Sequence, residues 1–504
     1  MIKNNKRLFF LSILAIFSVL FNSAVISMAV VYIFSDLGSS SATASYATVF
    51  FGVGNVITIP LAIVFKERIG IPKFFLICQV CFIASTLLAG FATTYPAFIF
   101  YRFLQGLSSG PLFILLSTFL VSKLEDPDKP KVLRFNLTSF IVAPIIGASW
   151  GGWIGYDYNW RHIFTINAIL MIIITVALFR ELRRFPVTIE KKPFDTIGYI
   201  SFIIGFFSLS FFITLGQELD WFRSNLMTIS FFTGLIFLIY FVLRSLNHSN
   251  PIFELKLLKQ PLVSLALINL WVLFATYSGM TLILSIWLTL YVRFTVIWVA
   301  VVLGVMVIST LLLTHIMRHY LNTHKVWIPF CLAIILLGIS CFYTSNFNID
   351  IDLGRLAISR ILAGFSFALF LPSLLHLIMQ NQPPDLSIKA LTLFQITRAS
   401  SSGLGATIFY TIWIRRQVFF YERLGGGLTE FSPITDQFFI RAKAFGLSKA
   451  QANPQLDEFL TAQATSLALN DCCYLMGWMT VLLLILFVIS YLRRDVLYRE
   501  QPQI

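Results

Sequence analysis

Three arginines stand inside long apolar segments of the sequence, namely Arg102, Arg360 and Arg398. A cation at the centre of a bilayer costs at least about 2.5 kcal/mol, so such residues are functional candidates by default. His315 and His376 also stand in or near apolar segments, where imidazole could carry a proton, although a lone histidine there is more often a hydrogen-bonded packing residue. None of the 23 acidic residues falls clearly inside an apolar segment. These cations therefore have no carboxylate partner in their own segments.

Signatures of other chemistries do not occur in the sequence. There is no P-loop, nucleotide-binding fingerprint, HExxH motif or nucleophile elbow, and the six cysteines indicate neither a disulfide framework nor a metal site. We therefore expect no enzymatic activity, no cofactor and no bound metal. The formal net charge of +14 could indicate nucleic acid, but basic loops on one side of a membrane explain it better.

The elements that must position these residues are long apolar runs. The chain is 58% hydrophobic and 12% charged, about half the charged fraction of soluble domains. Many runs are long enough to cross about 30 Å of hydrocarbon, and they lack the alternation of barrel strands. We predict an all-α membrane protein with fourteen transmembrane helices. They are placed at about 8–34, 45–65, 74–93, 96–121, 135–156, 162–179, 196–215, 226–243, 262–292, 295–317, 326–345, 355–379, 390–414 and 474–492.

Basic residues are distributed unequally between the two sides of this topology. The segments on the side of the termini hold 24 lysines and arginines, and the opposite loops hold 10, six of them in the long 415–473 loop. Because basic residues accumulate in cytoplasmic loops, both termini should be cytoplasmic, in a bacterial inner membrane. The charged connection near 180–195 divides the chain. We expect a six-helix bundle at 1–185, two inserted helices at 186–258, and a second six-helix bundle at 259–504 that includes the external loop 415–473.

The fourth predicted helix carries the most specific motif. It reads FIFYRFLQGLSSGPLFILL, with Arg102 and Gln105 followed by Gly106 and Gly110. Glycines spaced four apart let a second helix approach closely. This RxxQGxxxGP string resembles the fourth helix of the major facilitator superfamily, in its fourteen-span drug:proton antiporter group, the EmrB-like exporters. The resemblance implies the major facilitator fold.

Other strings agree with this family in chain order. The fifth predicted helix resembles the family's antiporter motif, although Ala148 stands where the family has a proline. The segment KERIGIPK resembles the family's cytoplasmic gating loop, with Glu67 in the place of an aspartate. The residues that carry these helix-packing and gating motifs are Glu67, Arg68, Gly70, Pro144, Gly147, Gly151 and Gly152, together with Gly106 and Gly110. The resemblance extends over nearly the whole chain.

The first predicted helix departs from the family pattern. Asn22 stands where the family has an aspartate implicated in coupling, and Ala24 and Ser27 replace its threonine and asparagine. Proton coupling through a carboxylate at the membrane centre is therefore in doubt. If protons are used, His376 or an acid at an external helix end would carry them. The candidate substrate or coupling residues are Asn22, Ser27, Arg102, Gln105, His376 and Arg398.

The resemblance implies a secondary transporter that exports small hydrophobic or amphipathic organic compounds by alternating access. An importer or facilitator of the same fold, and a membrane sensor or scaffold that does not transport, remain alternatives. Related exporters work with a periplasmic adaptor and an outer-membrane channel, and we carry over such partners as an expectation. Three interior arginines without an acid favour a neutral or anionic substrate over a lipophilic cation, unless cations bind to aromatic faces alone.

Overall fold

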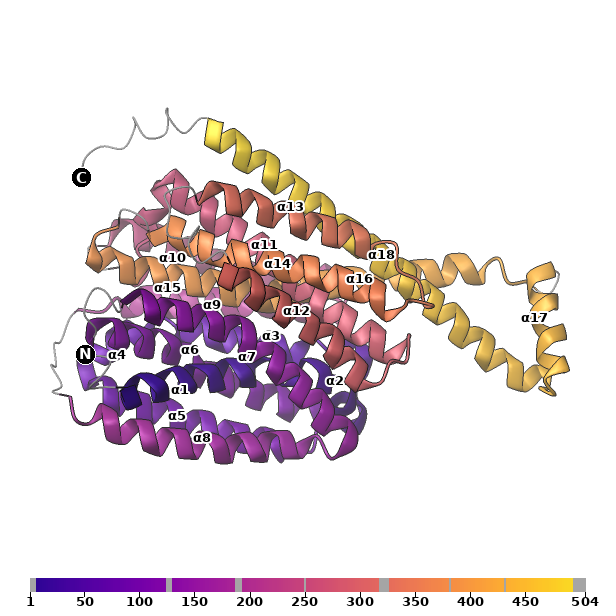
Figure 1. Cartoon of the computed structure of the whole chain (residues 1–504), viewed down its shortest axis with the longest axis horizontal. Coiled ribbons are helices and arrows are strands. Elements are labelled where there is room, and N and C mark those ends of the chain that lie inside the picture. The colour runs from indigo at the N-terminus through magenta and orange to yellow at the C-terminus, as the bar shows by residue number, and fades with distance from the viewer. Residues whose placement is uncertain are drawn as a thin grey trace.

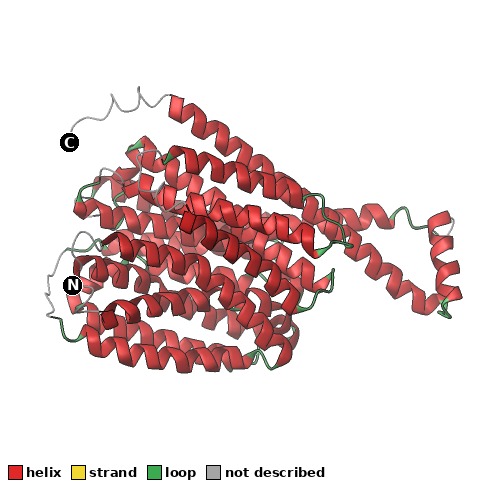
Figure 2. Cartoon of the chain, viewed as in Figure 1, coloured by secondary structure: helices red, strands yellow, loops and turns green. Residues whose placement is uncertain are grey.

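The computed structural model describes residues 6–123, 129–185, 193–248, 251–316, 326–379, 382–429 and 432–492. Helices account for nearly all of this part of the chain, and it contains no strand (Figure 2). The all-α class predicted from the sequence is confirmed. The helices are α1 Lys6–Ala24, α2 Ile26–Asp36, α3 Tyr46–Thr58, α4 Leu61–Ile69, α5 Ile71–Gly90, α6 Tyr95–Lys123, α7 Lys129–Asp157, α8 Arg161–Leu182, α9 Thr196–Leu215, α10 Asn225–Asn247, α11 Pro261–Leu290, α12 Val296–Ile316, α13 Trp327–Thr344, α14 Leu353–Met379, α15 Pro384–Ser400, α16 Ala406–Gly425, α17 Pro433–Ala444 and α18 Lys449–Leu492.

The long helices lie side by side in one bundle (Figure 1). Helices α1–α8 pack mainly with one another, as do α11–α16 with α18, and we call these the N-terminal and C-terminal groups. The beginning of α1 and the end of α18 lie at the same end of the bundle, which we call the terminus end, and α17 lies at the opposite end, the arm end (Figure 1). The positions of the domain boundaries near 185 and 258 stay predictions.

Many large apolar side chains on the outer surface of the bundle are exposed. On α8 and α10, for example, Ile173 is 60% exposed and Ile236 is 61% exposed. Extended apolar surfaces of this kind are typical of contact with lipid rather than water. Together with the length of the helices, they make this a multi-pass membrane protein.

Eleven helices in the described part are long and apolar enough to cross a membrane, and a bent pair, Ser41–Thr58 with Leu61–Ile69, makes twelve. The other two predicted spans, 135–156 and 390–414, correspond to α7 and to α15 with α16, which fall outside that set. The count of fourteen therefore stays a prediction. The membrane-embedded, multi-pass character does not depend on it.

Three predicted spans are interrupted. The first, 8–34, breaks at Val25 into α1 and α2, and the second bends by 51° near Pro60. A π-helix, Ser401–Gly405, separates α15 from α16 within the thirteenth. Unwound or bent backbone inside a membrane protein is tolerated where other protein groups surround it, and it often marks a functional site.

The predicted external loop 415–473 is largely helical, which corrects the sequence interpretation. The end of α16, all of α17 and the first half of α18 project from the arm end of the bundle (Figure 1), and we call residues 415–473 the arm. Asn453 and Pro454 lie inside α18, which begins at Lys449 and continues to Leu492. Its 44 residues correspond to about 66 Å, about twice the thickness of a bilayer core. The last predicted span is thus the second half of one continuous helix.

Helices α9 and α10 form a pair between the two groups. Asp195 caps α9 by accepting from the amide of Gly198 at 3.0 Å, and it pairs with Arg244 of α10 at 2.8 Å. The hydroxyl of Tyr199 donates to the carbonyl of Ile57 in α3 at 3.0 Å. Since α9 also contacts α16 and the π-helix, the pair packs against both groups.

Candidate functional site

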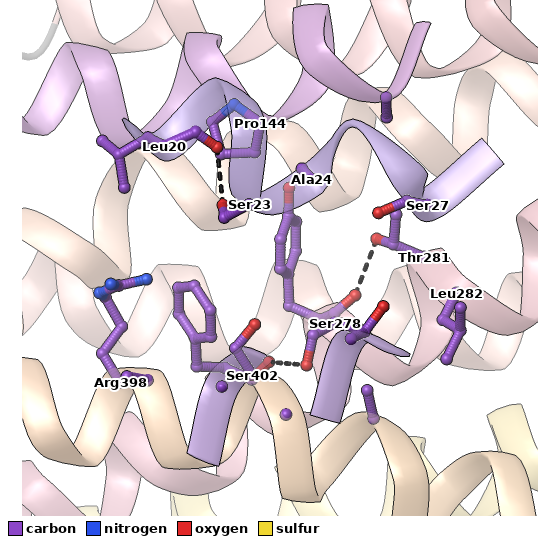
Figure 3. A pocket seen from close by; sticks show the side chains of 18 of the residues that line it. Leu20, Ser23, Ala24, Ser27, Pro144, Ser278, Thr281, Leu282, Arg398 and Ser402 are labelled. Carbon is purple, nitrogen blue, oxygen red and sulfur yellow. Dashed lines mark hydrogen bonds between the residues drawn. The ribbon is translucent and has the colours of Figure 1, made fainter. Parts of the chain in front are cut away.

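A cavity of about 180 Å³ lies at the centre of the bundle, between the two groups of helices. The N-terminal group contributes residues of α1, α2, α3 and α7, and the C-terminal group contributes residues of α11, α12, α14, α15, the π-helix and α16. Hydroxyl groups line much of it, from Ser23 and Ser27 on one group and from Ser278, Thr281 and Ser402 on the other (Figure 3). Its position between the groups means that relative motion of the groups would reshape it.

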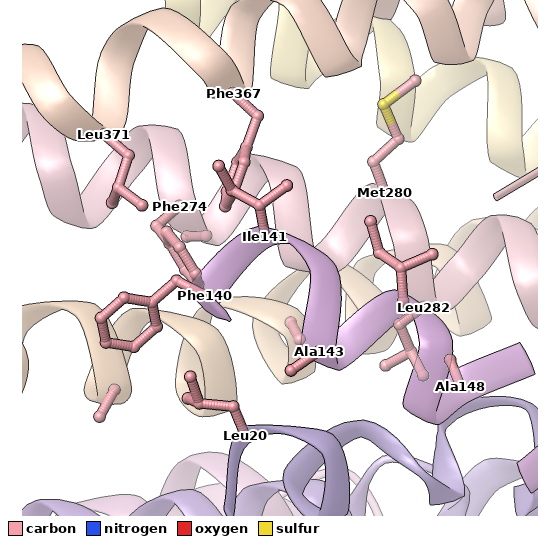
Figure 4. Packing of buried hydrophobic residues seen from close by; sticks show 14 of the residues in the cluster. Leu20, Phe140, Ile141, Ala143, Ala148, Phe274, Met280, Leu282, Phe367 and Leu371 are labelled. Carbon is pink, nitrogen blue, oxygen red and sulfur yellow. The ribbon is translucent and has the colours of Figure 1, made fainter. Parts of the chain in front are cut away.

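Aromatic and aliphatic side chains form the rest of the wall, and several of them belong to the cluster of buried hydrophobic residues in Figure 4. Phe140 belongs to α7, and Phe274 and Phe367 face it from the C-terminal group. The rings of Tyr277 and Phe367 stack with their centroids 4.4 Å apart. An apolar cavity with a few polar groups is the usual design for a small organic ligand.

Arg398 is the charged residue of this cavity wall, and no acidic residue accompanies it among the described lining residues. Its guanidinium carbon lies 4.5 Å from the ring centre of Phe140 and 5.6 Å from that of Phe274. Its Nε donates to Oε1 of Gln395 at 2.9 Å. Attraction to the two ring faces partly offsets the cost of placing this cation in the membrane interior.

Arg102 lies behind the cavity wall rather than in it. It is fully buried, and its guanidinium lies over the ring of Phe51, 4.4 Å from the ring centre. Phe51 itself lines the central cavity. It donates to Oε1 of Gln105 at 2.6 Å and to the carbonyl oxygens of Asn22 and Ser23 at 3.5 and 3.3 Å. Those carbonyls lie three and two residues before the break at Val25. Arg102 thus donates to backbone oxygens beside the break, where the helix is interrupted.

Gln105 extends this network to α5. Its Nε2 donates to the hydroxyl of Thr86 at 2.6 Å, and that hydroxyl donates to the carbonyl of Phe82 at 2.6 Å. Two of the candidate residues named from the sequence, Asn22 and Gln105, are thus hydrogen-bond partners of Arg102. The structure uses the side chain of Gln105 and the backbone of Asn22.

The side chain of Asn22 points elsewhere. It is buried, its Nδ2 lies 3.8 Å from the sulfur of Met171, and its Oδ1 has no hydrogen-bond partner among the described residues. Asn22 is not one of the residues that line the central cavity, whereas Ala24 and Ser27 are. The two candidate residues of the first span therefore have different surroundings.

The remaining interior cation, Arg360, is also buried within the C-terminal group. It donates to the hydroxyl of Ser359 at 3.0 Å and to the sulfur of Met280 at 3.3 Å. His376 lies on the exposed surface of α14, and it does not line the central cavity. Within the described chain, no cluster of three or more metal-binding side chains occurs.

The predicted packing glycines lie at close helix crossings. A Cβ atom at Gly106 or Gly110 would collide with the backbone of α3 at Phe51 and Asn55, and one at Gly151 would collide with the carbonyl of Val25. Gly147 packs in the same way on the carbonyl of Phe21, and Gly152 packs against Met28 and Val296. Pro144 lies inside α7, which continues through it, and it lines the cavity.

The gating-loop residues lie at the terminus end. Gly70 has φ +82°, a conformation that favours glycine, and it makes the turn between α4 and α5. Glu67 and Arg68 precede this turn at the end of α4. The ring of Phe194, just before α9, lies 5.6 Å from the guanidinium of Arg68, so the loop reaches toward the inserted pair.

The arm end is closed by contacts that the sequence did not reveal. The hydroxyl of Tyr410 in α16 donates to the carbonyl of Ser41, so that the C-terminal group contacts the N-terminal group directly. In the loop between α9 and α10, Glu218 accepts a hydrogen bond from Tyr46, and Gln217 accepts one from Arg415 at 2.5 Å. This loop thus contacts both groups. The sequence of this loop, GQELDWF, does not by itself indicate these contacts.

A second polar cluster lies at the same end of the N-terminal group. Asp36, at the end of α2, accepts from Arg161 at 2.6 Å and from the indole nitrogen of Trp160 at 3.0 Å. These hydrogen bonds, chiefly that of Arg161, lower the pKa of Asp36 below its usual value. Arg161 also donates to the carbonyl of Ala92 at 3.2 Å. The cluster connects the ends of α2, α5 and α8.

Comparison with known proteins shows which family has this architecture. The family model described as "Major Facilitator Superfamily" matches residues 11–406, more than three quarters of the chain. The chain belongs to the major facilitator superfamily. Its central cavity between two groups of helices is thus part of a transporter fold. The family resemblance drawn from the motifs is confirmed.

Individual relatives cover nearly the whole chain. The multidrug export protein EmrB of Haemophilus influenzae is 25% identical over 477 residues, which cover 94% of each chain. The fatty acid resistance protein FarB of Neisseria gonorrhoeae is 24% identical over 481 residues, 95% of this chain and 94% of FarB. A crystal structure of a POT family transporter with a thioalcohol-conjugated peptide has a TM-score of 0.65 at 13% identity, covering 97% of this chain and 96% of the other. It supports the fold alone.

Proposed function

We propose that this major facilitator protein exports small hydrophobic or amphipathic organic compounds across the membrane. The observation that carries the proposal is the aromatic, hydroxyl-lined cavity between two groups of helices. Relatives of nearly equal length are named as a multidrug export protein and a fatty acid resistance protein. One name states export of drugs and the other resistance to fatty acids, and an apolar cavity with a few polar groups is suited to small organic compounds.

Transport would proceed by rocking of two bundles around the cavity, with a division near residues 185 and 258. The glycine contacts of α7 with α1 and α2 hold the N-terminal bundle rigid, and the contacts at Gly152 and Tyr410 form the closed arm end. A second, smaller chamber continues from the cavity toward the terminus end, with Ile16 and Ile59 in its wall. In this conformation the substrate would therefore enter from the terminus end.

Proton coupling needs a different carrier from the family aspartate. The described cavity residues include no acid, and His376 lies outside the cavity. Glu218 and Asp36 are acids at the arm end, and their contacts would change when that end opens, because both join separate helices. A facilitator that uses no proton is favoured by the same absence of an acid, and it is the second candidate function.

The arm is our candidate site for a periplasmic adaptor, which would lead to an outer-membrane channel. Its large apolar side chains are unusually exposed: Ile434 is 71% exposed, Ile440 68%, Phe445 84% and Phe459 58%. Exposed apolar surface on a projecting helical element often marks a protein contact. This assignment requires that the arm end faces the periplasm of a bacterial inner membrane and that the termini face the cytoplasm.

The experiment is an accumulation assay on cells with and without the chain, using a panel of labelled amphipathic compounds and an uncoupler. An exporter lowers accumulation, an importer raises it, and a sensor or scaffold leaves it unchanged. Export that stops when the uncoupler is added indicates a proton-coupled carrier. Movement that follows the concentration gradient of the compound, with or without the uncoupler, indicates a facilitator. A Gly151→Val variant, whose side chain would collide with the carbonyl of Val25 at the break between α1 and α2, serves as the inactive control. Unchanged accumulation of every compound in the panel would refute export.

A further inference from the structure

The central cavity has two chambers of different character. The larger, of about 180 Å³, is aromatic and lined with hydroxyls, and the smaller, of about 30 Å³, lies beside it toward the terminus end. Val19, Leu20, Asn55 and Arg398 line both chambers. The smaller chamber has room for a compact polar group but not for an aromatic ring.

Hydrogen-bond donors without acceptors gather at the smaller chamber. Gln395, which is 2% exposed, uses its Oε1 to accept from Arg398, so its Nε2 remains as a donor. That Nε2 has no partner among the described residues. The side chain of Arg398 donates no other hydrogen bond among the described residues, so its two terminal nitrogens also remain as donors. A buried donor without an acceptor is costly, and a ligand oxygen would satisfy it.

The charge of the site agrees with its hydrogen bonding. Arg398 is a cation in a wall without a described acid, and its planar guanidinium presents paired N–H groups that match a planar carboxylate. A lipophilic amine placed in the same chamber would meet the guanidinium and an amide donor, which both repel it. The rings of Phe140 and Phe274 flank the cation and leave its edge for the ligand.

We infer that the smaller chamber is a carboxylate subsite, in which Arg398 and Gln395 bind the head group of an amphipathic acid while the larger chamber takes its apolar body. The inference rests on the proposed function, because it names the substrate class of the same cavity. It assigns to Gln395 a role in recognition.

The test compares three naphthalene compounds of similar shape on the purified full-length chain in lipid nanodiscs. Equilibrium dialysis at neutral pH measures the binding of naphthylacetate, naphthylacetamide and naphthylethylamine. We expect the acid to bind on the order of tenfold more tightly than the amide, and the amine to bind most weakly. Arg398→Gln should remove the preference for the acid while leaving the affinity for the amide unchanged. Gln395→Leu should reduce the preference for the acid.

Two further variants control for folding and for net charge. Arg398→Lys keeps the cation without its planar fork, and it should retain a smaller preference for the acid. Arg423→Gln changes the net charge equally at an exposed position on α16, and it should leave all three affinities unchanged. Equal affinity of the unmodified chain for acid and amide, or equal loss of both in Arg398→Gln, would overturn the subsite.

Accumulation of the same three compounds in cells separates this inference from the proposed function. If the purified chain prefers the acid through Arg398 and yet changes no compound's accumulation in cells, export is wrong and the subsite stands. If cells export the amine more efficiently than the acid, export stands and the subsite is wrong.

Discussion

Replacement of Arg102 by methionine tests whether this buried cation holds the break in the first span. The change removes the donor from the side chain of Gln105 and from the carbonyls of Asn22 and Ser23. A buried acceptor left without a donor costs about 1–3 kcal/mol, and the two carbonyl contacts, at 3.3 and 3.5 Å, fall at the low end. Removal of the cation meanwhile relieves a burial cost of at least about 2.5 kcal/mol.

Because these effects oppose one another, the free energy of unfolding should change by no more than about 2 kcal/mol. We expect the balance between conformations to change more, because the two carbonyls that Arg102 contacts lie beside the break at Val25. Loss of about 1.4 kcal/mol from one conformation shifts its population tenfold. We therefore expect Arg102→Met to lower the initial rate of efflux by about tenfold while the protein stays folded.

The assay pairs thermal unfolding of the purified variant with efflux of a preloaded fluorescent substrate from cells, normalised to the amount of protein in the membrane. Arg102→Lys is the matched variant, since its single ammonium can reach some of these acceptors but cannot span all three. It should fall between the unmodified chain and Arg102→Met. A monodisperse Arg102→Met protein that transports at the unmodified rate would show that Arg102 only ties helices together.

Three other predictions follow from the arm end and the topology. Asp36→Asn should lower stability at neutral pH and make stability depend less on pH in the acid range. The lowered pKa of Asp36 in the folded protein adds stability at pH values above the pKa of the unfolded chain, roughly 4. That stability is lost as the pH falls through the pKa of the folded protein. A thermal-shift series across pH checks this, and an acid limb as steep as that of the unmodified chain would contradict it. Tyr410→Phe removes the hydroxyl that donates to Ser41, so the arm end should open more often. Labelling of a cysteine introduced at Thr281, in the cavity wall, should then rise severalfold. Unchanged labelling would mean that this contact does not close the cavity. A cysteine introduced at Ser432 should react with an impermeant reagent in intact cells, and reaction only after lysis would invert the topology.

Hydropathy predicted the long helices because burial in lipid imposes a continuous apolar sequence on each of them. The interruptions could not be found in this way. Val25 and its neighbours are as apolar as an unbroken helix would require, and the break becomes apparent only when Arg102 is seen beside the carbonyls of Asn22 and Ser23. The π-helix at Ser401–Gly405 is similarly hidden in a sequence of small residues.

The prediction of a loop at 415–473 was wrong for the opposite reason. Its polar composition resembled that of a loop, yet α16 and α18 continue through it as helices, since a helix that leaves the membrane needs no apolar residues. Within the cavity, Arg398 was a candidate and Gln395 was not. A signal was present, because residues three apart lie on one face of a helix, and a glutamine three positions before an intramembrane arginine could have been examined as its partner.

The place of Arg398 joins substrate recognition to the proposed rocking motion. One of its flanking rings, Phe140, belongs to α7 of the N-terminal group, and the other, Phe274, belongs to α11 of the C-terminal group. Motion of the groups apart at this seam would remove one ring from the cation and leave it less stabilised. A bound carboxylate would replace that lost stabilisation, because its interaction with the guanidinium is stronger than that of a ring. An acidic substrate would therefore lower the cost of the conformational change as well as bind, whereas a neutral compound of the same shape would only fill the cavity.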